Sequence, residues 1–166
     1  MSSTTTGALL FNQELAEFLL GPIAIKVGSC SATRVPSVSQ AYGCRICRAT
    51  GEVCVFLSES RSTSVLRDLR DGGAFSAVFS RPATHKTVQL KAPAVRIQPL
   101  EAGDQVLIER HGLRAAGELI SLGYAPAFSQ ALMAPDITDA VCVCFMPVVG
   151  FNQTPGVGAG QPLGAG

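Results

Sequence analysis

Residues 53–91 constrain the fold more than any other part of this 166-residue chain. Residues 53–58 are a short apolar run of β-forming residues, too brief for a helix, and predict a strand. The polar residues 58–64, SESRSTS, follow directly, and residues 65–70 then place apolar side chains on one helical face. Glycines at 72 and 73 end that helix, because glycine adopts the left-handed closing conformation without a steric penalty. The pattern predicts a strand that leads through a hydroxyl-rich turn into a short helix.

This turn has the chemistry of an anion site. The first turn of a helix carries unpaired N–H groups and the positive end of the helix dipole. Ser60, Ser62 and Thr63 add hydroxyl donors, and Arg61 adds a planar guanidinium suited to phosphate oxygens. The alternative is an ordinary N-cap, with Arg61 in solvent. Local sequence leaves both interpretations open.

Composition excludes several classes of function. The formal net charge is +1 and the chain has no tryptophan, so neither a basic surface nor an aromatic platform for nucleic acid is expected. The first residues lack the pattern of a signal peptide. The longest nearly apolar run, residues 140–151, is shorter than the roughly 20 residues of a membrane helix. We expect one cytoplasmic domain with no membrane partner.

The six cysteines invite two other interpretations. Without an export signal, in a chain long enough to form a core, free thiols are expected rather than disulfides. Cys44 and Cys47 have zinc-knuckle spacing, and Cys142 and Cys144 could supply two further thiolates. However, the second pair alternates in a strand pattern, where cysteine often serves as a small core residue. We therefore predict no metal site.

The remaining elements predict a mainly β (α+β) fold. Asn12 is a suitable N-cap for a first helix that ends at residues 21–22, and residues 1–11 are expected to be flexible. Six antiparallel strands in a split, nearly closed barrel and two later flanking helices account for residues 12–149 as one domain. The strands are predicted at 23–31, 37–46, 53–58, 74–79, 87–98 and 139–148, and the later helices at 104–122 and 126–134. Residues 150–166, rich in glycine and proline, are expected to form a flexible tail.

Three motifs in this order resemble one known family. They are PSVS at 36–39, LSESRS at 57–62 and THKTVQLK at 84–91. With the surrounding elements, residues 12–98 resemble the pyridoxamine 5′-phosphate oxidase-like family, which has the FMN-binding split-barrel fold. The QTPG sequence at 153–156 is similar to the tails of flavin-binding members.

The resemblance implies a homodimer with one FMN in each of two clefts between the subunits. Carried over to this sequence, it places ten residues in the cofactor site. Ser39, Gln40 and Ala41 would lie beside the isoalloxazine ring, Leu57 and Ser58 along the ribityl chain, Ser60, Arg61 and Ser62 on the phosphate, and Lys86 and Thr87 of the other subunit would close the cleft.

The implied function is an FMN-dependent oxidoreductase acting on a small molecule. The alternatives are a non-catalytic flavin carrier or sensor, and a split barrel that uses haem or a deazaflavin. Ser62 replaces the lysine that follows the phosphate-binding arginine in the oxidase, and the oxidase's tryptophan-containing substrate pattern is absent, so vitamin B6 oxidation is not expected. No catalytic acid or base is predicted. His85 could polarise a substrate or lie at the surface, and His111 is expected to be exposed.

Overall fold

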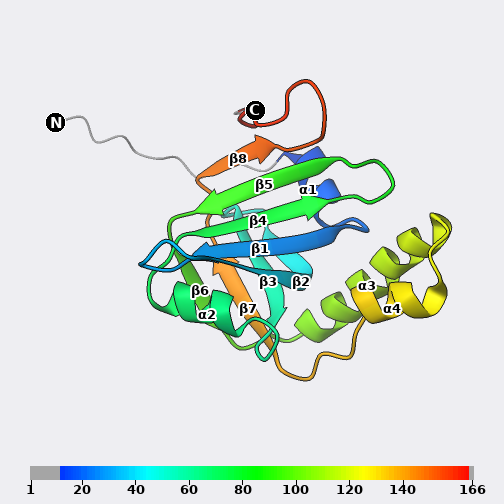
Figure 1. Cartoon of the computed structure of the whole chain (residues 1–166), viewed down its shortest axis with the longest axis horizontal. Coiled ribbons are helices and arrows are strands. Elements are labelled where there is room, and N and C mark those ends of the chain that lie inside the picture. Colours follow the sequence, from blue (N-terminus) through cyan, green and yellow to red (C-terminus); the bar gives the residue numbers. More distant parts are fainter. Residues whose placement is uncertain (1–11, 165–166) are drawn as a thin grey trace.

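The computed structural model describes residues 12–164. Within that range, helices and strands occur in the order α1–β1–β2–β3–α2–β4–β5–β6–α3–α4–β7–β8 (Figure 1). The helices are α1 (Gln13–Leu19), α2 (Thr63–Arg70), α3 (Asp104–Ser121) and α4 (Pro126–Met133). The strands are β1 (Ala24–Cys30), β2 (Pro36–Cys47), β3 (Glu52–Ser58), β4 (Phe75–Ser80), β5 (Thr87–Ala92), β6 (Val95–Gln98), β7 (Ala140–Phe145) and β8 (Val149–Asn152).

All strand pairs are antiparallel and form one sheet in the order β6-β7-β3-β2-β1-β4-β5-β8. Figure 1 shows the two halves of this sheet crossing, with β1, β4, β5 and β8 on one side and β2, β3, β6 and β7 behind. The main core lies between the halves. Phe75 of β4 and Phe145 of β7 meet there, with ring centroids 4.8 Å apart. The fold class is confirmed as mainly β, but the sheet is open and has eight strands rather than the predicted six.

The two strands beyond the predicted six, β6 and β8, each begin shortly after a proline. The predicted strand at 87–98 is two strands, because Pro93 interrupts it. β5 pairs with β4, whereas β6 pairs with β7 in the other half of the sheet. Pro147 likewise separates β7 from β8, which begins after the end of the strand predicted at 139–148. Proline has no N–H to donate to the ladder, so at each position the chain leaves one half of the sheet and joins the other.

The predicted tail from residue 150 contains part of β8, so the boundary at 149/150 falls inside a strand. β8 pairs with β5, and the chain then folds back so that Phe151 bridges to Pro162. Leu163 donates its backbone N–H to the Gly150 carbonyl at 2.8 Å and packs against the main core. Backbone groups of β5 bind β8, and β8 in turn binds the returning chain. Composition alone does not reveal these hydrogen-bond partners. The expectation for residues 1–11 lies outside the described residues.

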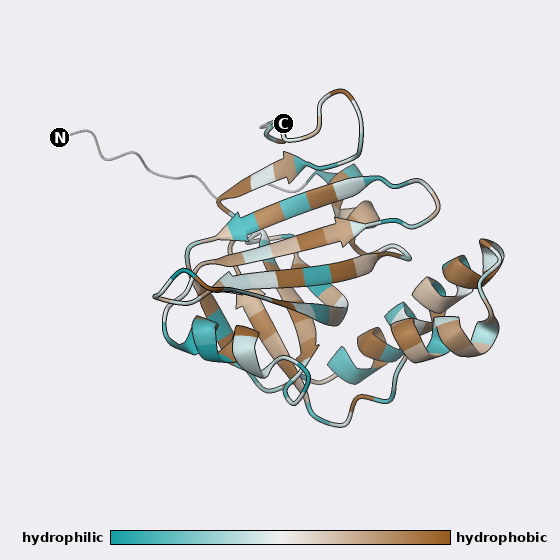
Figure 2. Cartoon of the chain, in the orientation of Figure 1, coloured by the Kyte–Doolittle hydropathy of each residue, from teal (hydrophilic) through white to brown (hydrophobic). Residues whose placement is uncertain are grey.

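The helices agree closely with the sequence. Asn12 caps α1 by accepting a hydrogen bond from the Leu15 N–H at 2.8 Å. The α3–α4 hairpin packs beside β2 and encloses a second core, where Tyr42, Phe56, Ile108 and Ile137 are buried. Figure 2 shows apolar and polar residues alternating along β5, as expected for a strand with one face on a core. No described helix is both long and apolar enough to span a membrane.

The cysteines are only partly as predicted. Cys54 of β3 and Cys144 of β7 form a disulfide, and Cys30, Cys44, Cys47 and Cys142 are free. The two bonded residues lie directly opposite each other on neighbouring strands, 90 residues apart in the sequence. The expectation of free thiols was wrong for this pair because strand register, and not spacing along the chain, brings the two sulfurs together.

Candidate functional site

The candidate site is built around the turn between β3 and α2. β3 ends at Ser58 on the rim of the sheet, and α2 starts at Thr63, so residues 59–62 turn at the surface as predicted. Ser62 is 2% exposed and is the N-cap residue of α2, but its side chain makes no capping bond to the helix. Its hydroxyl instead lies 2.7 Å from the Ser39 hydroxyl of β2. The turn is thereby attached to β2 while the first N–H groups of α2 keep no side-chain cap.

Arg61 extends from this turn towards β2. Its Nη1 lies 3.4 Å from the Tyr42 hydroxyl, and the side chain is otherwise exposed. It does not pair with its neighbour Glu59, which binds Arg70 at 2.8 Å instead. The described residues therefore place a guanidinium with no carboxylate partner beside the N-terminus of a helix, which is an arrangement that binds phosphate oxygens.

The other side of the turn already holds an anion. Asp139, just before β7, accepts hydrogen bonds from the Ser58 hydroxyl at 2.8 Å and the Ser60 N–H at 2.7 Å. The bonds from Ser60, and next the bond from Ser58, lower the pKa of Asp139 to about 2. Ser58 and Ser60 thus use these donors within the chain, and Arg61 and the first amides of α2 remain for an external anion.

The predicted residues on β2 and β3 face in two directions. Ala41 and Leu57 are buried in the main core, so only their backbones could reach a ligand. Gln40 points to the other face of the sheet. There it accepts a hydrogen bond from Lys26 Nζ at 2.7 Å and donates one to the Leu132 carbonyl of α4 at 2.8 Å.

Lys86 and Thr87 lie elsewhere in the protomer. They follow the β4–β5 loop, and β5 is separated from β2 by β4 and β1. Three strand spacings correspond to roughly 14 Å. Lys86 Nζ lies 3.1 Å from Glu14 Oε1 and 5.1 Å from the centroid of the Phe18 ring, while the Thr87 N–H binds the Thr154 hydroxyl at 3.0 Å. One chain therefore brings Ser39, Ser58, Ser60, Arg61 and Ser62 together, but not Lys86 and Thr87.

Two hollows flank this region. The first, of about 340 Å³, lies between β2 and the α3–α4 hairpin and is lined by Tyr42, Ile108, Met133 and Ile137. The second, of about 450 Å³, lies on the outer face of the sheet and is mostly apolar. Its lining includes Val38, which is 74% exposed, and Lys91. The second hollow therefore spans strands that carry both groups of predicted residues.

The two histidines differ in environment. His85 is exposed in the β4–β5 loop and has a positive φ of 58°. His111 of α3 was predicted to be exposed, but it is half-buried and packs against Gly43 of β2. Burial, with a smaller effect of Arg114, lowers its pKa to about 4. The prediction failed because α3 packs against β2 and turns His111 towards Gly43, which the charged residues near it in sequence do not reveal.

Sequence reasoning did not select Asp139, Tyr42 or Thr154 as site residues. Each comes from a different part of the chain and reaches the site only through strand pairing. Asp139 precedes β7, which pairs with β3, and Thr154 follows β8, which pairs with β5. The QTPG sequence pointed to the Thr154 region, whereas neither Asp139 nor Tyr42 belongs to a recognisable motif.

Comparisons with known proteins add to this picture. No protein-family model matches the chain, and no curated protein matches its sequence. Solved structures do. HupZ from Group A Streptococcus has a TM-score of 0.54 at 15% identity, covering 90% of this chain and 99% of that one. A candidate pyridoxamine 5′-phosphate oxidase from Lactobacillus delbrueckii has a TM-score of 0.53 at 10% identity, with 90% and 97% covered.

An F420 reductase has a TM-score of 0.53 at 13% identity, covering 84% of this chain and 98% of that one. The chain has the pyridoxamine 5′-phosphate oxidase-like split-barrel fold. The likeness covers most of each compared chain. The resemblance noted in the sequence is therefore confirmed for the fold.

Proposed function

We propose that this split-barrel protein is an FMN-binding flavoprotein that acts as an oxidoreductase on a small molecule. The observation that carries the proposal is Arg61, whose guanidinium has no carboxylate partner and stands beside the uncapped N-terminus of α2. These donors fit a doubly charged phosphate. When bound, the flavin supplies the hydride chemistry, and the protein supplies position and electrostatics.

Different residues bind the phosphate, fix the turn and contact the flavin ring. Arg61 and the first amides of α2 hold the terminal phosphate, and the Ser39–Ser62 bond fixes the turn against β2. Asp139 keeps Ser58 and Ser60 in place from the other side. Ser39 and Gln40 of β2 pair with β1 but not with β3, so the side of their backbone towards β3 can offer groups to the ring, next to Ala41.

The site is completed by a second copy of the chain. Within one protomer, β1 and β4 separate Lys86 and Thr87 from β2, the strand that Arg61 contacts. The apolar hollow that exposes Val38 extends between β2 and β5 on the outer face of the sheet. A homodimer that covers this hollow would bury apolar surface and bring the β4–β5 loop of one subunit to the β3–α2 turn of the other.

Titration tests the proposal directly. The full chain, freed of bound flavin, is titrated with FMN, and quenching of flavin fluorescence is followed. Riboflavin, which lacks the phosphate, and a deazaflavin are the comparison ligands. We expect saturable binding of FMN, weaker binding of riboflavin and a dimer in solution. Equal affinity for FMN and riboflavin would exclude the phosphate site. Tighter binding of the deazaflavin would indicate that it, and not FMN, is the cofactor.

Turnover is a separate question. Bleaching of the bound flavin by NADH or NADPH, with recovery of its absorbance on addition of an electron acceptor, would support an oxidoreductase. A protein that binds FMN tightly but is not reduced by either nucleotide would instead be a flavin carrier or sensor.

A further inference from the structure

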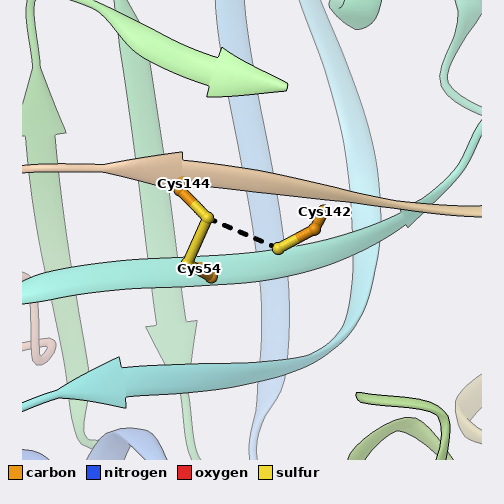
Figure 3. A group of neighbouring side chains, drawn as sticks. All are labelled: Cys54, Cys142 and Cys144. Carbon is orange, nitrogen blue, oxygen red and sulfur yellow. Dashed lines mark hydrogen bonds between the residues drawn. A yellow bond between two sulfur atoms is a disulfide. The ribbon is translucent and has the colours of Figure 1, made fainter. Parts of the chain in front are cut away.

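Three cysteines meet in the second core, away from the β3–α2 turn. Cys54 lies on β3, and Cys142 and Cys144 lie two residues apart on the same face of β7 (Figure 3). The three sulfur atoms are within 4.8 Å of one another, and each residue is at most 2% exposed. Cys54 and Cys144 are joined as a disulfide, and the Cys142 sulfur lies 3.5 Å from that of Cys144.

The third sulfur is the informative one, because a disulfide uses only two. When the disulfide is reduced, two strands that are already paired present three thiols to one point. Three sulfurs around a metal at a bond length of about 2.3 Å lie roughly 4 Å apart in a trigonal arrangement. The reduced cluster needs only small side-chain movements to reach that geometry.

Ligand number and type select the metal. Within residues 12–164, no further cysteine, histidine, aspartate or glutamate joins the group. Structural zinc sites take four ligands, whereas soft thiolates select copper(I), which accepts three.

The charge of a neighbouring side chain fits the choice of copper(I). Copper(I) with thiolate ligands leaves a net negative charge, and the Arg45 guanidinium lies 3.9 Å from the Cys142 sulfur. Asp104 of α3 holds Arg45 in place at 2.9 Å. Tyr42, Ile108 and Ile137, which pack around the cysteines, also line the 340 Å³ hollow. The hollow therefore lies next to the side chains that surround the cluster, although no cysteine lines it.

We propose that Cys54, Cys142 and Cys144 form a binding site for copper(I) when the Cys54–Cys144 disulfide is reduced. A dithiol reductant supplies two electrons and two protons, which convert the disulfide to two thiols while the dithiol becomes its own disulfide. Copper(I) then binds to the sulfurs and releases thiol protons to solvent.

The test uses the full chain, reduced with dithiothreitol and desalted without oxygen. Copper(I) is added as its acetonitrile complex, the thiolate-to-copper absorbance is followed in the ultraviolet, and a chromogenic chelator competes for the metal. We expect about one copper(I) per chain at this site. Cys142→Ser should lower the affinity for copper(I) by at least about tenfold. Loss of a residue that only orients a metal ligand already costs about that much.

Cys47→Ser is the matched control, because Cys47 is exposed on β2 and should leave the affinity unchanged. Thermal unfolding with and without copper(I) checks that each variant folds, and copper(I) should raise the melting temperature of Cys47→Ser more than that of Cys142→Ser. If the reduced protein retains no copper(I), or if Cys142→Ser binds it as tightly as the wild type, the cluster is a disulfide with a bystander thiol and the proposal is wrong.

Discussion

The β3–α2 turn and the β4–β5 loop carry the two halves of the predicted cofactor site, and they are built differently. At the turn, Ser58 and Ser62 are buried and bound to partners on β7 and β2. At the loop, Lys86 is exposed, and its ion pair with Glu14 joins two exposed side chains. The turn is fixed by the interior. Arg81 and Ala83 anchor the loop on buried Glu118, but the Lys86 side chain is held by an exposed ion pair, which contributes little.

This difference indicates how a shared site could be assembled. A rigid turn can position a phosphate without help from the rest of the ligand. A weakly held lysine can leave Glu14 for a stronger anion brought by a second subunit, at small cost. Each half would then make a separate contribution to binding, and the following experiments measure them.

The largest effect is expected at the turn. Arg61→Ala should weaken FMN binding by about 1–3 kcal/mol, because the variant loses a charge-assisted hydrogen bond to the phosphate. Fluorescence titration measures the change. Arg48→Ala is the control, since Arg48 is an exposed arginine at the opposite end of β3. Unchanged affinity in Arg61→Ala would remove this residue from the site.

Mixing two variants tests whether Arg61 and Lys86 contribute to one site from different subunits. Arg61→Ala and Lys86→Ala should each weaken FMN binding when pure. A mixed dimer of the two has one site with both substitutions and one with neither, so mixing should restore a population of tight sites. Titration after subunit exchange measures that population. If mixing restores nothing although mixed dimers form, the two residues act in the same subunit or not together.

Acid should affect the turn through Asp139. Its pKa is about 2 in the folded protein, below the ordinary value of 3.8, so this carboxylate stabilises the fold above about pH 4. That contribution is lost as the pH falls through about 2. Denaturant unfolding between pH 5 and 2 should therefore show a weaker acid dependence in Asp139→Asn than in the wild type. Asp136→Asn, which changes an exposed residue in the same segment, should leave the acid dependence as it is.

The smallest effect separates the turn from the loop by stability alone. Ser62→Ala should cost about 1 kcal/mol of unfolding free energy, because it leaves the Ser39 hydroxyl without its 2.7 Å partner. Ser80→Ala is the matched change at the loop. There Thr87 loses a 2.8 Å contact with Ser80 but still donates to the His85 carbonyl, so the cost should be smaller. Equal costs would show that the turn is no better fixed than the loop.

Local patterns in the sequence predicted much of the structure. Asn12 identified the start of α1, and residues 53–70 gave the strand, turn and helix in the right places. Each is decided by interactions between residues a few positions apart, which sequence displays directly. The motifs at 36–39, 57–62 and 84–91 also predicted the fold that the solved structures confirm.

The failures share one cause. Asp139 at the turn, the Cys54–Cys144 disulfide, β8 on the edge of β5 and the half-buried His111 all depend on which strands and helices become neighbours. Strand order in this sheet brings together residues as far apart in sequence as Val53 and Phe145, and no local pattern encodes that pairing.

The sequence by itself determined the mainly β fold, the β3–α2 turn and the arginine within it, because short-range patterns of apolar, hydroxyl and glycine residues define such elements. Only the tertiary structure decided that Ser58 and Ser60 bind Asp139 while Arg61 has no carboxylate partner among the described residues. The reason is physical. A hydrogen bond depends on distance in space, and in this sheet that distance follows from the pairing of β3 with β7 on one side and β2 on the other.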